Sequence, residues 1–330
     1  MVVFHTNQAI FALYRAFVRE SRKLPHLYLR QFWGIKGSDD VRAILKTENP
    51  HHVRDRKFKR MAKDLRKLEA ANKQKPKAFD HVLDVAYGRK GKLRRELMEP
   101  ILTDPTAPIP AKIIPAVESS RPPVYSKELT ALLTSGASRT VKRPLTEGNL
   151  AFPSTLPPRA NPHSDEAHLF GPFSKRRETN ARWRYFVDQW QKVRPPLQVV
   201  VEDRAADSKG VSLDDVHRAG IRSLPLQGLH IFEDVENIAH TPTHGSKNSA
   251  APDNSNVSRW VRRRYQKLLN RIPILTCTII HEGKPPGYSV SLSPNHFGSQ
   301  QTKIAEADSS DLEWIAESPP PAAKSAARVE

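Results

Sequence analysis

Residues that could take part in metal or acid–base chemistry occur in this sequence, but their spacing does not assemble a site. His51 and His52 are adjacent, so on a helix their side chains point about 100° apart and cannot easily share a metal ion. No HExxH pattern occurs, and "LTSGAS" does not satisfy the pattern of a nucleophile elbow. Two adjacent acidic pairs, better explained as helix starts than as acid–base dyads, are Asp39-Asp40 and Asp214-Asp215. We therefore expect no enzyme activity.

A glycine turn with basic side chains, "AYGRKGKL", is a second candidate for chemistry. Gly88 and Gly91 flank Arg89 and Lys90, and backbone amides at the following helix start could hold a phosphate. The segment lacks the Walker pattern and follows no predicted strand, so a plain helix-breaking turn is the favoured interpretation.

Cysteine usage and hydropathy exclude several classes of protein. Cys277 is the only cysteine, so the chain has no internal disulfide and no thiolate cage for zinc or an iron–sulfur cluster. We expect no metal and no directly bound cofactor. No apolar run is long enough to cross a membrane. Of 330 residues, 38% are hydrophobic and 28 are proline, which predicts one compact domain with long irregular segments.

The positive charge is concentrated in the first third of the chain. The whole chain has a formal charge of +18, and residues 1–100 hold 24 Lys and Arg against 11 Asp and Glu. Such a surface suits an acidic partner protein, a phosphorylated ligand or nucleic acid, or it keeps the protein soluble. The basic segment 54–67 contains few aromatic residues for base stacking, with only Phe58 nearby on the apolar side.

The elements that must position these charges are short amphipathic helices. Apolar residues recur at helical spacing within 7–24, and again in the basic segment 51–72. Between these segments we expect a break at Gly34 and Gly37 and a new helix with Ser38 as its N-cap. Residues 5–98 are therefore predicted to form a small antiparallel bundle of three to four helices.

The rest of the chain is predicted to be less regular. Residues 99–169 are a proline-rich, mostly irregular connector, with 13 prolines between Pro100 and Pro172. Residues 170–300 form a weakly ordered α+β extension with helices near 174–193 and 258–271 and strands at "LQVVV" and "ILTCTII". The tail 301–330 is expected to be disordered. The fold class is mainly α.

The motif Leu13-Tyr14-Arg15 lies in "ALYRAFVRESRKLP", a helix close to the N-terminus. This helix continues with basic residues and is followed by "NPHHVRDRKFKRMAKDLRKLEAAN". Together these segments resemble the first and third helices of the LYR-motif (complex I LYR) family, over about residues 5–98. Two segments, "AYGRKGKLRRELMEP" and the later "LFGPFSKRRETNARWRYF", most resemble a large fungal branch of the family with a long C-terminal extension.

The resemblance implies a mitochondrial matrix adaptor that binds acylated acyl carrier protein and supports iron–sulfur cluster biogenesis or respiratory complex assembly. The carrier would supply a phosphopantetheine-linked acyl chain, which enters the helical bundle. By position, Leu13 and Tyr14 would shape the acyl tunnel and Arg15 would contact the carrier. The further candidates for carrier contact are Lys59, Arg60, Lys63, Arg89 and Lys90. The candidates for the tunnel are Ile10, Phe17, Phe32, Phe58, Met61 and Leu65, with Phe32 and Phe58 both fitting the family's downstream phenylalanine.

Residues 1–19 resemble a mitochondrial presequence, because they are amphipathic and contain Arg15 and Arg19 but no acidic residue. Cleavage would remove the LYR motif, so we expect an uncleaved import signal that doubles as the first helix. The client complex stays unidentified. The alternative hypothesis is a basic protein associated with RNA or the mitochondrial ribosome.

Overall fold

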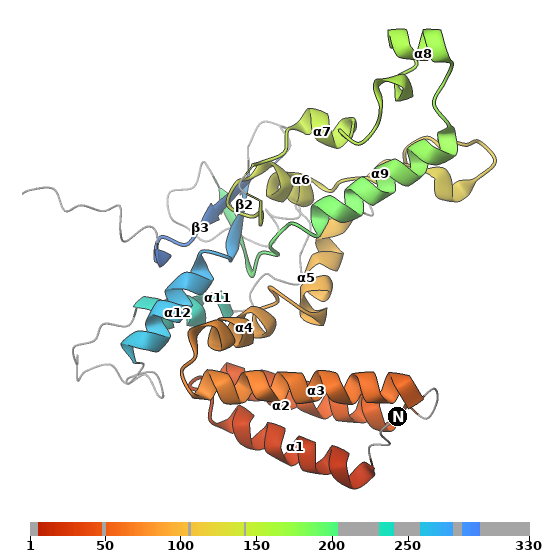
Figure 1. The fold of residues 1–330 in the computed structure, drawn as a ribbon. Coiled ribbons are helices and arrows are strands. Elements are labelled where there is room, and N and C mark those ends of the chain that lie inside the picture. Colours follow the sequence, from red (N-terminus) through yellow and green to blue (C-terminus); the bar gives the residue numbers. More distant parts are fainter. Residues whose placement is uncertain are drawn as a thin grey trace, which may run out of the picture.

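The computed structural model describes residues 6–47, 51–104, 107–141, 143–203, 231–240, 258–279 and 286–297 (Figure 1). The structure is mostly helical, with one three-stranded sheet, as the sequence predicts. The tail at 301–330, which the sequence predicts to be disordered, lies outside the described residues.

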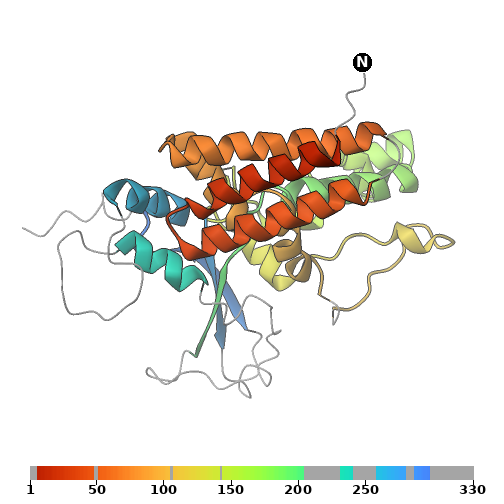
Figure 2. The same cartoon turned by 90° about the horizontal axis from the view of Figure 1, so that it is seen from below.

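The N-terminal bundle consists of three helices, α1 (Asn7–Arg22), α2 (Leu27–Leu45) and α3 (His51–Asn72), which lie side by side in two views (Figures 1 and 2). Thr6 caps α1, because its side chain accepts a hydrogen bond from the Ala9 amide at 3.3 Å. Ile10, Phe17 and Trp33 are fully buried between the helices. Each such large side chain contributes about 1.5–3 kcal/mol of transfer free energy, which makes the apolar stripes the main source of bundle stability.

Helix α2 is continuous, and the expected break at Gly34 and Gly37 is wrong. Ser38 lies in the middle of the helix and is not an N-cap. The reason is tertiary packing, because a Cβ atom at Gly37 would lie 2.7 Å from Cδ1 of Phe17. Glycine at this position costs about 1 kcal/mol of helix propensity, but it lets α1 approach α2 closely.

Helices α4 (Pro76–Ala86) and α5 (Lys92–Leu102) follow the bundle. The turn between them contains Gly88 at φ 66° and Gly91 at φ 87°, both in the left-handed region that favours glycine. The sequence prediction of an interruption at these two glycines is therefore confirmed.

The connector is irregular over most of its length. It contains the single turns η1 (Glu118–Ser120) and η2 (Pro158–Ala160) and the short helices α7 (Glu147–Ala151) and α8 (Asp165–Phe170). It also contains α6 (Lys127–Thr134), a helix that the sequence analysis did not identify. Ser126 caps α6, and Leu129, Leu132 and Leu133 are fully buried.

The sheet has the order β1-β2-β3, with β1 (Gln198–Asp203), β2 (Pro273–Ile279) and β3 (Gly287–Leu292). Strands β1 and β2 pair in parallel and β2 and β3 pair antiparallel, with Thr276 opposite both Val200 and Ser289. Side chains of β2 alternate between buried and half-buried, so one face of the strand packs against α6 and α9 (Lys175–Trp190). The strands predicted at "LQVVV" and "ILTCTII" are thus present.

The extension packs directly on the bundle through α11 (Ile231–His240) and α12 (Arg259–Leu269). Ser258 caps α12 as the sequence predicts, with its Oγ 3.4 Å from the Val261 amide nitrogen. The rings of Phe79 and Trp260 lie 4.9 Å apart between α4 and α12. Because one hydrophobic core includes side chains of α1–α4, α11 and α12, the bundle and these two helices form a single packed unit.

Candidate functional site

The LYR motif lies in the middle of α1, at the edge of the bundle core. Leu13 and Tyr14 are half-buried and pack against the core, while Arg15 is exposed. Successive helical side chains point about 100° apart, so Leu13 lies on the side of α1 that faces α3 and Tyr14 on the side that faces α2. Glu20 lies two helical turns after Leu13 on the same side of α1, and its carboxylate accepts a hydrogen bond from Asn72 of α3 at 2.8 Å. This contact shows that the Leu13 side of α1 faces α3.

A basic surface, here named the α1 face, includes Arg15 of the motif and continues along α1. It consists of Arg15, Arg19, Arg22 and Lys23. Together with Tyr14 and Val18 these residues line an open hollow of about 720 Å³. The guanidinium groups of the three arginines make no hydrogen bond or ion pair within the described part of the chain, whereas Lys23 pairs with Glu20 at 2.6 Å. The α1 face therefore combines uncompensated positive charge with nearby apolar side chains.

The tunnel candidates surround the interior of the bundle. Ile10, Phe17, Met61 and Leu65 are buried in its core, and Phe32 and Phe58 are half-buried at its edge. The ring of Trp33 links two of these residues, lying 6.1 Å from Phe17 and 5.9 Å from Phe32. The candidates thus contribute to one apolar cluster rather than to scattered positions.

The two glycines of α2 differ in their surroundings. Gly37 is buried in close contact with Phe17, whereas Gly34 is half-buried and a Cβ atom there would meet no atom within 4 Å. The indole Nε1 of Trp33 is buried and has no hydrogen-bond partner among the described residues. A buried N–H without an acceptor costs about 1–3 kcal/mol, so this atom favours a guest that brings a carbonyl oxygen.

A second basic surface, here named the α3 stripe, lies on another side of the bundle. It consists of Arg56, Arg60, Lys63 and Lys67 at helical spacing, with exposed Lys59 beside it. Nζ of Lys67 lies 2.7 Å from Nε2 of His81 in α4. The α3 stripe is therefore on the side of α3 that faces α4. Arg15 faces away from α3, so the structure does not bring it together with Arg60 and Lys63.

The other two contact candidates, in the glycine turn, have different environments. Arg89 is buried, and its guanidinium donates hydrogen bonds to the carbonyl oxygens of Tyr87, Pro195 and Arg271. It therefore joins the extension to the bundle, and the prediction of a surface contact is wrong for this residue. Lys90 is exposed and pairs with Oδ2 of Asp84 at 2.7 Å.

No group of three or more His, Cys, Asp or Glu side chains in the described residues could hold a metal ion. Cys277 is buried, and burial raises the pKa of its thiol to about 12, with a smaller contribution from Glu128. His240 and His244 stand four apart in sequence, but Pro242 separates them and His244 lies outside the described residues. Asp214-Asp215 also lie outside them.

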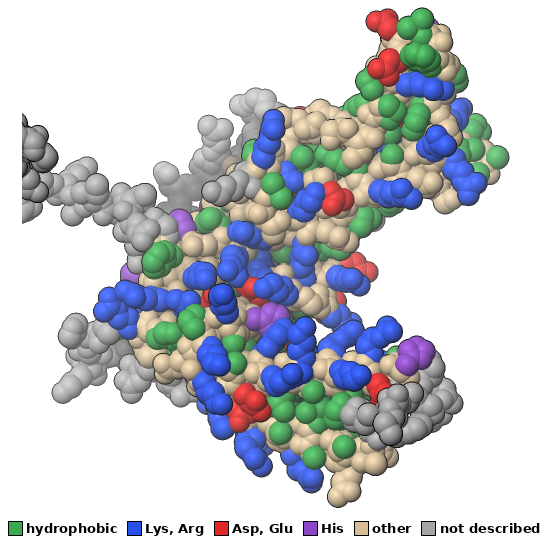
Figure 3. Space-filling view, in the orientation of Figure 1, with side chains coloured by type: hydrophobic (Ala, Val, Ile, Leu, Met, Phe, Trp, Pro, Cys, Tyr) green, Lys and Arg blue, Asp and Glu red, His purple; other side chains and the backbone are tan. Residues whose placement is uncertain are grey.

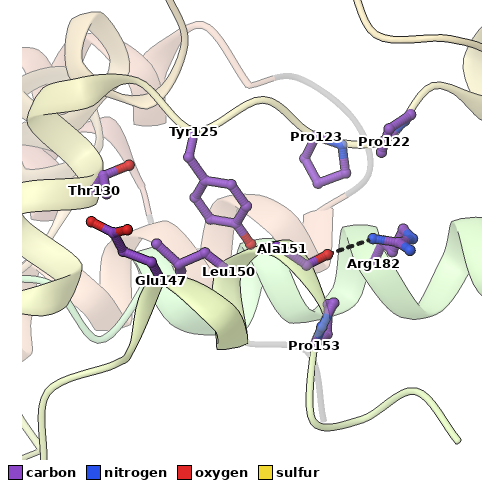
Figure 4. Close-up of a pocket in the computed structure, with 9 residues that line it drawn as sticks. All are labelled: Pro122, Pro123, Tyr125, Thr130, Glu147, Leu150, Ala151, Pro153 and Arg182. Atoms are coloured by element: carbon purple, nitrogen blue, oxygen red, sulfur yellow. Dashed lines mark hydrogen bonds between the residues drawn. The ribbon is translucent and has the colours of Figure 1, made fainter. Parts of the chain in front are cut away.

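One pocket that sequence reasoning did not identify lies in the connector, next to α9 (Figure 4). Its volume is about 450 Å³. The walls are mostly apolar, and Arg182 of α9 closes one side by donating a hydrogen bond to the Ala151 carbonyl at 3.0 Å. The lining residues are Pro122, Pro123, Tyr125, Thr130, Glu147, Leu150, Ala151, Pro153 and Arg182.

Sequence reasoning also missed Arg19 and Arg22 as partners of Arg15, although their i, i+4, i+7 spacing places all three on one helix face. It missed His81 beside Lys67 as well, and no sequence pattern connects these two positions. None of the helices among the described residues is long and apolar enough to span a membrane.

Comparison with known proteins gives one match. Residues 13–98 match the family model described as LYR motif-containing protein 2-like. No curated protein and no solved structure matches. LYR-motif proteins are typically mitochondrial, generally have assembly or adaptor roles, and generally partner with acyl carrier protein. The predicted fungal branch rests in part on residues beyond this match and stays a prediction. The N-terminal helical region of this chain, over residues 13–98, belongs to the LYR-motif family.

Proposed function

We propose that this protein is a non-enzymatic mitochondrial adaptor that binds acylated acyl carrier protein through its N-terminal bundle. The observation that carries the proposal is the α1 face, where three unpaired arginines surround the LYR motif and the hollow beside it. A carrier protein presents acidic side chains, and the positive charge of the α1 face is complementary to them.

The carrier contacts are assigned to the α1 face alone. Arg15, Arg19 and Arg22 share one side of α1, whereas Arg60 and Lys63 lie on the side of α3 that faces α4. One small protein that covers Arg15 would therefore leave the α3 stripe free. The α1 face also has exposed Phe11 and half-buried Tyr14 at its border, which supply the aromatic contacts that protein interfaces require.

The acyl chain would supply most of the binding free energy. Each buried CH₂ group contributes about 0.8 kcal/mol, whereas an exposed ion pair contributes about 0–1 kcal/mol. Ten methylene groups would give about 8 kcal/mol before the cost of ordering and of opening the bundle. The arginines would mainly set orientation and association rate, so added salt should slow association much more than it speeds dissociation.

The bundle interior offers features that suit this guest. Phe17 must move before a long chain can pass Gly37, because the two residues are in close contact. The unpartnered Nε1 of Trp33 can donate a hydrogen bond to a carbonyl oxygen of the phosphopantetheine arm or the thioester. The prosthetic group belongs to the partner, and this chain contributes the binding surface.

The proposal includes a location in the mitochondrial matrix and a role in iron–sulfur cluster biogenesis or respiratory complex assembly, as the family resemblance implies. It also includes an uncleaved import signal. Ile10 and Phe17 of α1 are fully buried, so removal of this helix would take away part of the bundle core. N-terminal sequencing of the mitochondrial protein should therefore find α1 intact.

Native mass spectrometry of the full chain co-expressed with the mitochondrial acyl carrier protein tests this function. We expect a complex whose mass includes phosphopantetheine and a fatty acyl chain. The variant R15E/R19E/R22E should bind the carrier much more slowly and carry less of it, whereas R56E/R60E/K63E, which changes the net charge equally, should retain it. Absence of the carrier from the wild-type protein, while acylated carrier is present in the cell, would refute the proposal.

A further inference from the structure

A cleft separates the bundle from the part of the molecule that contains α5 and α9, and Lys and Arg side chains gather along its bundle side (Figure 3). Helix α3 forms this side, and α4 closes the inner end of the cleft (Figure 1). Because Lys67 contacts His81 of α4, the α3 stripe faces into the cleft. Arg56, Arg60 and Lys63 are exposed and continue the stripe toward the open end.

The charges in the stripe are regularly spaced. At 1.5 Å rise per residue, Arg56 and Lys67 are about 16 Å apart along the helix, and consecutive cations are about 4.5–6 Å apart. Asp64 of α3 is near Lys67 but pairs with Lys36 of α2 at 2.7 Å. The row of four cations itself contains no carboxylate, and such a row suits a ligand with repeated negative charges.

The inner end of the cleft holds several bases, and the carboxylates near them, Asp64 and Asp84, are already paired with Lys36 at 2.7 Å and with Arg271 at 2.8 Å. Lys67 and His81 are in hydrogen-bonding contact, and Lys63 and Lys90 are close enough to affect the pKa of Lys67. Burial lowers the pKa of Lys67, Asp64 opposes this shift, and Lys63 and Lys90 add to it. Burial also lowers the pKa of His81, with Lys67 and Lys90 acting in the same direction. An anion bound here would relieve the repulsion.

The composition of the stripe distinguishes a nucleic acid from an acidic protein. Protein interfaces depend on buried aromatic or aliphatic anchors, whereas contacts to a phosphate backbone need only positive charge. Large apolar side chains are exposed elsewhere, at Phe11, Leu27 and Ile35 of the bundle, but none lies in the stripe. The cleft narrows toward α4, which favours a single strand over a duplex.

We propose that the cleft beside α3 binds the phosphate backbone of a single-stranded nucleic acid, without base recognition, through Arg56, Arg60, Lys63 and Lys67. Binding uses a surface separate from the α1 face and does not depend on the carrier. For a single strand, every phosphate that the protein neutralises adds about 0.7 to the magnitude of the slope of log K against log salt concentration. Removal of three cations should therefore reduce the slope by about 2. At about 0.1 M salt, one decade below 1 M, this corresponds to binding that is about 100-fold weaker.

Fluorescence anisotropy with a labelled single-stranded oligouridylate and the full-length protein tests the proposal. The variant R56E/R60E/K63E should bind about 100-fold more weakly, and the slope of log K against log salt should fall by about 2. The matched variant R15E/R19E/R22E has the same change in net charge and should lose less than about 3-fold. The neutral variant R56Q/R60Q/K63Q should show the same order of effect and avoids introducing new repulsion.

Three results would overturn the proposal. Equal weakening by the two glutamate variants would show that only net charge matters. Tighter binding of a duplex than of the single strand would exclude the single strand as the ligand. Displacement of the oligonucleotide by oligoglutamate at equal charge concentration would indicate an acidic protein partner instead. Far-UV circular dichroism of each variant checks that the fold is intact.

Discussion

Alanine variants at the two glycines of α2 separate the contribution of helix propensity to the free energy of unfolding from the contribution of packing. Both glycines lie inside the helix, so alanine should stabilise each by about 1 kcal/mol through propensity alone. At Gly34 a Cβ atom meets nothing within 4 Å, and G34A should keep this gain. At Gly37 the same atom would lie 2.7 Å from Cδ1 and 2.8 Å from Cε1 of Phe17.

The expected cost at Gly37 follows from these distances. Ordinary carbon–carbon contacts are about 3.5–4.0 Å, so the Phe17 ring would have to shift by roughly 1 Å. The ring is fully buried and lies against Trp33, which leaves little room for the shift. Overpacking of this kind costs about 1–3 kcal/mol. Because the propensity gain is the same in both variants, G37A should be less stable than G34A by about 1–3 kcal/mol.

Urea unfolding followed by far-UV circular dichroism measures the difference directly, and equal m-values would show that both variants unfold in the same way. The double variant F17L/G37A provides the control. Leucine removes the ring atoms that clash, so the cost of G37A should be smaller in the F17L background. Equal stability of G34A and G37A would refute the claim that Gly37 is present for close packing against Phe17.

Three further predictions concern groups outside the α1 face. The pKa of His81 is lowered in the folded state, so below a pH of about 6.5 the unfolded chain binds more protons than the folded chain. The free energy of unfolding should therefore fall as the pH falls below about 6.5. Urea unfolding at several pH values should show a smaller fall for the variant H81Q. The charged groups that face His81 are Lys67 and Asp64 of α3, Lys90 of the turn and Asp84 of α4. Cys277 should not react with a thiol reagent such as DTNB in the native protein at pH 8, since burial raises its pKa to about 12, and rapid labelling without denaturant would contradict this burial. D84N should destabilise the protein by about 3 kcal/mol in urea unfolding, because it removes a buried carboxylate that pairs with Arg271 at 2.8 Å. D80N should cost less than about 1 kcal/mol, because the carboxylate of Asp80 is more exposed than that of Asp84.

Local sequence patterns were sufficient to predict most of the helices, caps and turns that depend on neighbouring residues. Helical periodicity predicted the helices of the bundle, and the Ser258 cap and the turn at Gly88 and Gly91 were also predicted. These features depend on residues within one or two helical turns of each other. The resemblance at Leu13-Tyr14-Arg15 added the family, which the match over residues 13–98 confirms.

Features that depend on distant partners could not be predicted in this way. Gly37 resembled a helix breaker because its contact, Phe17, is on another helix. Arg89 resembled a surface residue because its acceptors, the carbonyl oxygens of Pro195 and Arg271, are more than 100 residues away in sequence. Helix α6 was missed because it is short and lies among prolines, and its burial depends on the sheet.

The buried junction between the bundle and the extension depends on these long-range contacts, and it determines where the proposed binding surfaces lie. Arg89 and Asp84 hold the end of α12 against the turn after α4, and Tyr87 and Tyr265 pack together beside them, with their rings 6.1 Å apart. Without the extension, Asp84, Tyr87 and Arg89 would lose these partners, and α9 would not lie across the cleft from α3. The extension therefore contributes the far wall of the cleft beside the α3 stripe, while its described residues leave the α1 face exposed. If both surfaces bind as proposed, the protein can hold a carrier and a nucleic-acid strand at the same time, on two sides of one rigid bundle.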